Sequence, residues 1–184
     1  MEAISDGNRM LGIFAESHVP YRIDRKHQKV HSEVPGLVDM FAKALKHLER
    51  AENGYLLQVE AGRVDHAGHA NDAGAMLHEM LEFDEAVAFA RDYVDSHNDT
   101  LLIVTTDHGT GGCQLNGNGS KYSESGPALD RMERIQGSFE MLEDVFTSSE
   151  RFDSALFEKV TGITPTTEQA VQAQALIDAK AKYL

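Results

Sequence analysis

The feature that most constrains the fold is a pair of short apolar segments separated by one long amphipathic segment. Residues 55–59 and 99–105 have the length and the aliphatic or aromatic composition of buried strands. Between them, apolar residues recur at helical spacing over residues 71–96. A strand, a helix and a second strand in this order form a crossover unit, in which the strands run parallel and helices cover the sheet. The sequence therefore predicts an α/β fold with a mostly parallel sheet flanked by helices.

The flanking segments extend this prediction to the whole chain of 184 residues, a length that suits one domain. Residues 10–15 are expected to form a further short strand, and a helix is expected to start near Pro35. Beyond a glycine-rich loop over residues 109–126, apolar stripes predict one helix around residues 135–146 and a final helix from about Thr164. We thus expect residues 1–112 to form the α/β portion and residues 113–184 a loop and helical portion.

Acidic and imidazole side chains follow both predicted strands directly. Because the carboxyl ends of parallel strands meet at one edge of a sheet, these side chains are expected to lie close together. Carboxylate and imidazole groups are ligands of Zn²⁺, and a carboxylate without a neighbouring imidazole suits Mg²⁺ better. Two such groups can hold two ions that clamp a phosphoryl transfer. The candidate metal ligands are Glu60, Asp65, His69, Asp107 and His108.

Simpler interpretations apply to several residues taken singly. An aspartate after a strand is often a helix cap, and a histidine in a loop is usually a solvated side chain. For His66, three roles remain open: a group that supports a ligand, a group on the phosphate side of the site, or an exposed side chain. Cys113 has no base near it in sequence, which disfavours a nucleophile. The glycines at 109–112 lack the lysine of a phosphate-binding loop.

Composition excludes several classes of protein. A net charge of −13 argues against a specific nucleic-acid partner, because such proteins concentrate lysine and arginine. No apolar run reaches the length of a membrane span, and no signal peptide is recognisable at the start of the sequence. A single cysteine excludes an internal disulfide.

The segment from Val59 to His69 (Val-Glu-Ala-Gly-Arg-Val-Asp-His-Ala-Gly-His), followed by Thr105-Thr-Asp-His108, closely resembles the metal-site signature of alkaline phosphatases. Weaker similarity to that family extends over residues 12–24 and 161–165. The resemblance implies that Glu60 binds Mg²⁺, that Asp65 and His69 bind one Zn²⁺, and that Asp107 and His108 bind a second.

The resemblance also implies a three-layer α/β domain that is incomplete in this chain, so that residues 1–184 form one partial domain. It implies hydrolysis of phosphate monoesters through a phosphoserine intermediate and a periplasmic or secreted location. It is also compatible with a homodimer. The family's nucleophilic serine and a later zinc-binding histidine have no match in the sequence, whose last histidine is His108. We therefore expect the chain by itself to carry most metal ligands, to lack the nucleophile and to be inactive.

Two alternatives remain open within this interpretation. A phosphodiesterase or a phosphomutase of the same superfamily would use a related metal site with a different nucleophile. The chain could also serve as a metal-binding fragment without catalysis, and activity against an activated aryl phosphate distinguishes these functions.

Overall fold

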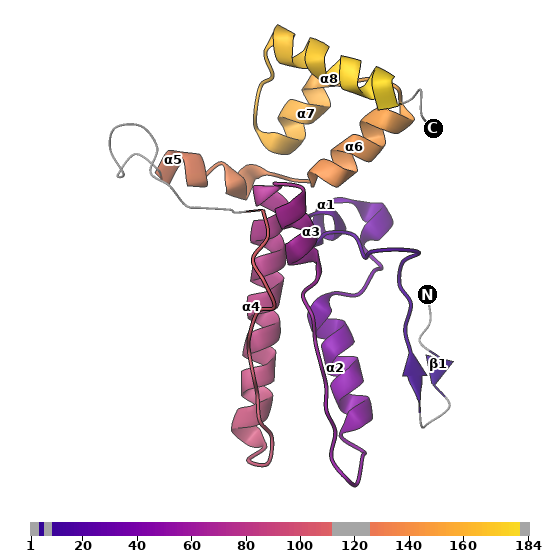
Figure 1. The fold of residues 1–184 in the computed structure, drawn as a ribbon, viewed down its shortest axis with the longest axis vertical. Coiled ribbons are helices and arrows are strands. Elements are labelled where there is room, and N and C mark those ends of the chain that lie inside the picture. Colours follow the sequence, from indigo (N-terminus) through magenta and orange to yellow (C-terminus); the bar gives the residue numbers. More distant parts are fainter. Residues whose placement is uncertain (1–3, 6–8, 112–125, 181–184) are drawn as a thin grey trace.

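The computed structural model describes residues 4–5, 9–111 and 126–180. The described part is elongated and mainly helical (Figure 1). Its lower arm contains the parallel-lying helices α2 (Leu37–Leu48) and α4 (Ala73–Ser96), and its middle contains α1 (Arg22–His27) and α3 (Arg63–His69). The upper end consists of α6 (Phe139–Ser148), α7 (Ser154–Thr161) and α8 (Thr167–Lys180). The remaining elements are β1 (Ile4–Ser5), β2 (Met10–Leu11), the 3-10 helices η1 (Lys29–His31) and η3 (Met132–Arg134), and α5 (Gly126–Leu129).

The long helix and its neighbours agree with the pattern in the sequence. Helix α4 starts two residues after Asn71 and ends at Ser96, where the sequence predicted its end. Asp72 caps it by accepting a hydrogen bond from the amide of Ala75 at 2.9 Å. Helix α2 begins two residues after Pro35, as expected for a proline near a helix start. The helix expected over residues 71–96 and the helix expected near Pro35 are therefore confirmed.

The predicted parallel sheet, in contrast, is absent from the described residues. There the single ladder is antiparallel and pairs β1 with β2, so the strand expected over residues 10–15 reduces to Met10–Leu11. Residues 55–59 and 99–105 have no ladder partner among the described residues, and their apolar side chains are exposed: Leu56 by 94%, Leu101 by 82% and Ile103 by 73%. A strand needs a neighbour at hydrogen-bonding distance, and local sequence does not supply one. The described residues therefore do not show the predicted parallel pairing, which stays a prediction.

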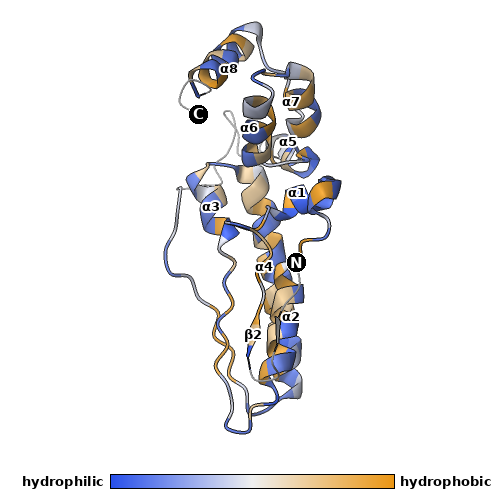
Figure 2. Ribbon diagram, turned by 90° about the vertical axis from the view of Figure 1, so that its right-hand side faces the viewer, coloured by the Kyte–Doolittle hydropathy of each residue, from blue (hydrophilic) through white to orange (hydrophobic). Residues whose placement is uncertain are grey.

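Both segments nevertheless run in an extended course along α4. The chain turns back after Ser96, and the segment that follows retraces α4 from its C-terminal end to the level of α3 (Figure 1). Residues 55–62 rise to the start of α3 in the same direction. Figure 2 shows hydrophobic stretches on these extended segments. The polar residues that follow residues 59 and 105 consequently lie at the same level of the molecule.

Two small cores stabilise the helices. The first lies at the level of α3 and is formed by Tyr21, Ile23, Ala67 and Ala75. The second joins α6, α7 and α8 through Leu142, Phe146, Val160 and Ile177. The apolar stripe predicted around residues 135–146 is present in α6, and the final helix begins close to the expected position. Helix α7 was not predicted; it ends at Gly162, whose φ of +68° favours glycine.

Two carboxylates from the middle of the molecule accept hydrogen bonds from the start of α6, namely from its capping residue Ser138 and its first residue Phe139. Asp24 accepts hydrogen bonds from the Ser138 amide at 2.9 Å and from the Ser138 hydroxyl at 2.7 Å. Asp72 accepts the Phe139 amide at 2.6 Å while it also caps α4. Asp24, Asp72 and Ser138 are all buried, and burial raises the pKa of Asp24. This capping cluster of Asp24, Asp72 and Ser138 joins the α6–α8 unit to α1 and α4.

Acidic side chains of α4 fix the helices packed against it. Glu82 pairs with Arg25 of α1 and accepts the amide of Leu37 at 2.9 Å. Glu79 accepts the amide of Arg22 at 2.5 Å. Both glutamates are buried, which the amphipathic pattern of the sequence did not predict. An open cavity of about 440 Å³ between α1, α2 and α4 borders Glu82 and contains none of the candidate metal ligands.

Replacement of Glu79 by glutamine is expected to change how stability depends on pH. Burial raises the pKa of Glu79 above its ordinary value of 4.5, so the folded protein keeps this proton to higher pH than the unfolded chain does. The contribution of Glu79 is therefore fully present below pH 4.5 and is lost as the pH rises through the folded-state pKa. Glu79→Gln retains an acceptor for Arg22 and should be more stable than the wild type at pH 8.

Urea denaturation at a series of pH values measures this effect. We expect the free energy of unfolding to fall less between pH 4.5 and pH 8 in Glu79→Gln than in the wild type. Glu168→Gln, a substitution at an exposed position of α8, is the control and should follow the wild type. Identical pH profiles for Glu79→Gln and the wild type would contradict the prediction.

Candidate metal centre

The candidate ligands lie where α3 meets the segment that follows residue 105. The two backbones touch: a Cβ on Gly68 would lie 2.9 Å from the carbonyl oxygen of Thr110. A Cβ on Gly111, whose φ is +75°, would lie 2.1 Å from the carbonyl oxygen of Gly68. Glycine is thus required at both positions. This contact places the side chains near His108 against the face of α3 that carries Asp65 and His69.

Asp65 is the centre of the resulting cluster. Its Oδ2 lies 3.5 Å from Nε2 of His69, one helical turn later, and its Oδ1 lies 3.8 Å from Nδ1 of His108. Nε2 of His108 lies 3.5 Å from Oδ2 of Asp107. Four of the five predicted ligands are therefore linked in a chain of pairwise contacts. We call Asp65, His69, Asp107 and His108 the ligand cluster.

Thr110 connects two members of the ligand cluster. Its hydroxyl donates to Oδ1 of Asp65 at 2.6 Å and lies 3.0 Å from Nδ1 of His108. Since the single hydroxyl proton is used for Asp65, Nδ1 of His108 must donate to the threonine oxygen. The lone pair of His108 then lies on Nε2, the state in which a histidine binds a metal while its other nitrogen is held by a hydrogen bond.

The electrostatics of Asp65 agree with a carboxylate that stays ionised. The hydrogen bond from Thr110 lowers the pKa of Asp65, and the imidazoles of His69 and His108 lower it further. The side chains are open to solvent, with exposed fractions of 34% for Asp65 and 71% for His69. An ionised acceptor beside two accessible imidazoles is a suitable environment for a divalent cation.

Two pairs of ligand atoms have the chemistry and the separation expected of two ligands on one zinc ion. Two ligand atoms on a tetrahedral zinc, each at about 2.0–2.1 Å, lie about 3.3 Å from each other. The separations between Asp65 and His69 and between Asp107 and His108 are both 3.5 Å. Among the described residues, however, no three histidine, cysteine or acidic side chains converge as one metal-binding group. The arrangement is two adjacent half-sites and not a closed cage.

Glu60 does not join the ligand cluster. It is exposed, and a Cβ added to Gly62 would lie 3.4 Å from its Oε1. Among the described residues, no ion pair links Glu60 to His69 or His108. Its assignment to Mg²⁺ therefore stays a prediction.

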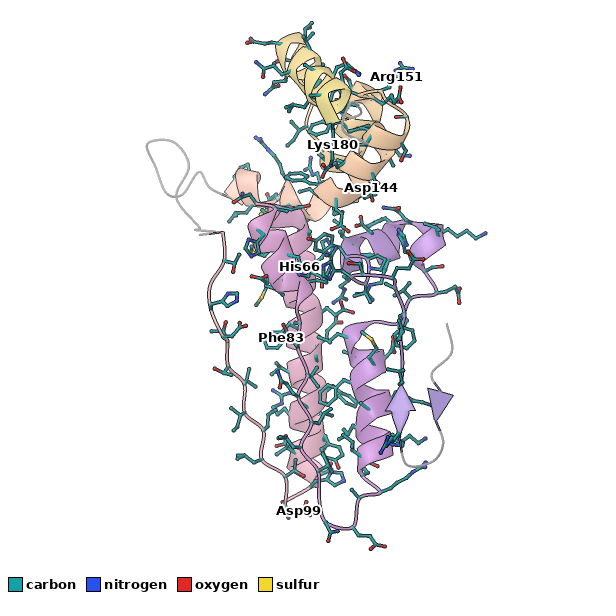
Figure 3. The ribbon with its side chains drawn as sticks, turned by 45° about the vertical axis from the view of Figure 1, so that its right-hand side comes forward. His66, Phe83, Asp99, Asp144, Arg151 and Lys180 are labelled. Carbon is teal, nitrogen blue, oxygen red and sulfur yellow. The ribbon has the colours of Figure 1, made fainter. Side chains whose placement is uncertain are left out.

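His66 lies on α3 beside the ligand cluster, at the level of α1 (Figure 3). Its ring contacts that of His18 with centroids 4.1 Å apart, and its Nδ1 lies 3.1 Å from Nη1 of Arg63. Burial lowers the pKa of His66, and His18 and Arg63 lower it further. Sequence reasoning missed Thr110, His18 and Arg63. Only Arg63 had a local signal, since it precedes His66 by three positions on one helix.

Comparison with known proteins identifies the family. The family model for alkaline phosphatase matches residues 2–180. The chain belongs to the alkaline phosphatase family. It is similar to the repressible alkaline phosphatase of Saccharomyces cerevisiae, with 40% identity over 109 residues, which cover 55% of this chain and 19% of that protein. It is also similar to alkaline phosphatase 3 of Bacillus subtilis, with 36% identity over 112 residues, 61% of this chain and 23% of that protein.

Solved alkaline phosphatases are similar to this chain in overall structure. The crystal structure of the alkaline phosphatase from Thermus thermophilus matches with a TM-score of 0.86 and 40% identity, over 96% of this chain and 37% of that one. The cold-active enzyme from Shewanella sp. matches with a TM-score of 0.68 and 26% identity, over 93% of this chain and 44% of that one. The chain thus spans less than half of each of these alkaline phosphatases. Within the described residues, no helix has the length and hydropathy to cross a membrane.

Proposed function

We propose that this chain supplies metal ligands for the hydrolysis of phosphate monoesters. The observation that carries the proposal is the contact of Asp65 with both His69 and His108 in a member of the alkaline phosphatase family. In this proposal Asp65 and His69 hold one Zn²⁺, Asp107 and His108 hold a second, and Glu60 holds Mg²⁺. When bound, such ions supply positive charge for the phosphoryl oxygens and activate an oxygen nucleophile.

The residues of the chain prepare this chemistry in three ways. Thr110 lowers the pKa of Asp65 through its hydrogen bond and orients His108 so that its Nε2 lone pair is free. The backbone contact at Gly68 sets the separation between α3 and the second pair of ligands. His66, held by Arg63 and His18, supplies a polar group on the same helix for the substrate side. The nucleophilic serine is expected from a part of the family's sequence that has no counterpart in these 184 residues.

A chimeric enzyme tests the proposal directly. The chain would replace its counterpart in the Thermus thermophilus alkaline phosphatase, whose fold it shares closely. We expect zinc-dependent hydrolysis of 4-nitrophenyl phosphate by the chimera, little hydrolysis of bis(4-nitrophenyl) phosphate, and no turnover by the chain alone. A folded chimera that hydrolyses the diester in preference to the monoester would favour a phosphodiesterase. A folded chimera with no zinc-dependent turnover would contradict the proposal.

Thr110→Val is expected to weaken zinc binding by the chain without unfolding it. The substitution keeps the shape of the side chain but removes the hydrogen bonds to Asp65 and His108. Loss of a group that orients a metal ligand typically costs 10–100-fold in affinity, so we expect a decrease of at least about 10-fold. Isothermal titration with ZnCl₂ measures it. Thr105→Val removes an exposed hydroxyl that bonds only to a neighbouring carbonyl and is the matched control; equal affinities for both variants would contradict the role of Thr110.

A further inference from the structure

Arg63 makes three different contacts with one buried guanidinium group. The side chain is 7% exposed. Its Cζ atom lies 3.6 Å from the centre of the Tyr21 ring, a cation–π contact. Its Nη2 lies 2.9 Å from each carboxylate oxygen of Glu140 on α6. Its Nη1 lies 3.1 Å from Nδ1 of His66. The contacts with Tyr21 and Glu140 therefore fix the guanidinium group in the position from which it contacts His66.

The contact between Arg63 and His66 determines where the imidazole carries its proton. A guanidinium group has only donors and stays protonated in proteins. Nδ1 of His66 must therefore accept the hydrogen bond, and the proton of the neutral ring lies on Nε2. The lone pair of His66 on Nδ1 is therefore used by Arg63, and the free nitrogen, Nε2, carries a hydrogen. His66 cannot bind a metal as a neutral imidazole, although it stands next to Asp65 in the sequence.

This state is the reverse of the state of His108. Thr110 requires a proton on Nδ1 of His108 and leaves the lone pair on Nε2. Two histidines near one aspartate are thus held in opposite tautomers by different partners. Their chemistry differs accordingly, because His108 is prepared to coordinate a cation and His66 is prepared to donate to an anion.

We propose that Arg63 is a positioning residue that holds His66 as an Nε2–H donor for an anionic oxygen of the substrate. The proposal rests on the proposed function for the identity of that oxygen. Glu140 lies on α6, so the α6–α8 unit contributes to the alignment of His66 through Arg63. Without Arg63, the ring would rotate and the proton would distribute over both nitrogens. A lysine cannot replace it, because an ammonium group lacks the planar fork that meets all three partners at once.

Nitrogen NMR of the uniformly labelled chain tests this assignment without any assay of activity. At about pH 8.5, where free imidazole is neutral, we expect a coupling across the hydrogen bond between Nη1 of Arg63 and Nδ1 of His66. We also expect His66 to be protonated on Nε2 alone. His66→Asn assigns the signals. Absence of the coupling in the wild-type chain, or a proton on Nδ1, would overturn the proposal even if no variant folds.

Variants separate positioning from simple packing. In Arg63→Lys, which keeps the charge, we expect the coupling to vanish and the Nδ1–H tautomer to appear. Glu140→Gln should weaken the coupling, because one anchor of the guanidinium loses its charge. Arg151→Lys, at an exposed position remote from α3, should leave His66 unchanged. The same tautomer populations in the wild type and Arg63→Lys would overturn the proposal.

Inorganic phosphate distinguishes this proposal from the proposed function. In the zinc-loaded chain, phosphate is expected to shift the Nε2–H signal of His66 in the wild type and to shift it less in Arg63→Lys. If the coupling to Arg63 is present and zinc binds but phosphate leaves the Nε2–H signal unchanged, His66 is no donor to the anion and this proposal is overturned, whereas the metal-ligand role stands. If the coupling is present but the chain binds no zinc, the positioning of His66 stands and the proposed function fails.

Discussion

Asp72→Ala is expected to lower the free energy of unfolding by about 2–4 kcal/mol, as measured by urea denaturation. Asp72 is 1% exposed and serves two helices, since Oδ1 caps α4 and Oδ2 accepts the first amide of α6. Loss of a helix cap costs about 1 kcal/mol. An amide that stays buried without a partner costs a further 1–3 kcal/mol or so.

Two variants provide the controls for Asp72. Asp153 caps α7 in an exposed position, so Asp153→Ala should lose only the capping contribution of about 1 kcal/mol. Asp72→Asn retains the volume but has one acceptor oxygen for two amides, and its stability should fall between that of Asp72→Ala and that of the wild type. If Asp72→Ala costs no more than Asp153→Ala, the link from Asp72 to α6 does not contribute to stability.

Asp65→Ala is expected to reduce the zinc affinity of the chain by at least about 100-fold. Loss of a residue that only supports a ligand costs 10–100-fold, and Asp65 is placed as a ligand itself. It also contacts His69 and His108, so its removal destroys one half-site and the contact that joins this half-site to the other. Competition with a chromogenic chelator measures the affinity, and circular dichroism verifies that the helices remain.

Asp92→Ala is the matched control for Asp65→Ala. Asp92 is an exposed aspartate of α4 whose ion pair is with the adjacent Arg91. Its loss removes one negative charge from the chain at a distance from the ligand cluster, so zinc binding should stay within twofold or so of the wild type, because surface charges are screened by salt. Equal losses in the two variants would show that net charge, and not a site at Asp65, attracts the metal.

The helices were predictable because their determinants are local. The apolar repeat over residues 71–96 and the cap at Asp72 lie within the helix they specify. The sheet was not, because a strand depends on a neighbour that may lie anywhere in the chain. Residues 55–59 carry the pattern of a buried strand, and Leu56 is nevertheless 94% exposed among the described residues. Helix α7 has a local cap in Asp153 and an end signal in Gly162, so its omission was a failure to use available signals.

The candidate site was partly predictable for the same reason. Asp65 and His69 are one turn apart on α3, and their proximity follows from helical spacing. Their approach to His108 was expected from a sheet edge, whereas in the described structure it comes from the backbone contact at Gly68. Thr110 lies 45 residues from Asp65 and Glu140 lies 77 residues from Arg63, so local sequence around Asp65 and Arg63 does not mark these partners.

The segment that retraces α4 runs in an extended course after its initial turn. A helix of 24 residues is about 36 Å long, and α3 lies at its N-terminal end. Residues 97–100 form the turn that reverses the chain, and the eight steps from Thr100 to His108 cover about 26 Å when extended, which is roughly three quarters of the length of α4. The length of α4 therefore determines the distance that this segment has to cover. A deletion within residues 97–107 would pull His108 away from Asp65 by about the length of one extended residue, roughly 3.3 Å, while an insertion would be absorbed as a bulge. The reach of the chain, as much as any side chain, decides whether the two half-sites meet.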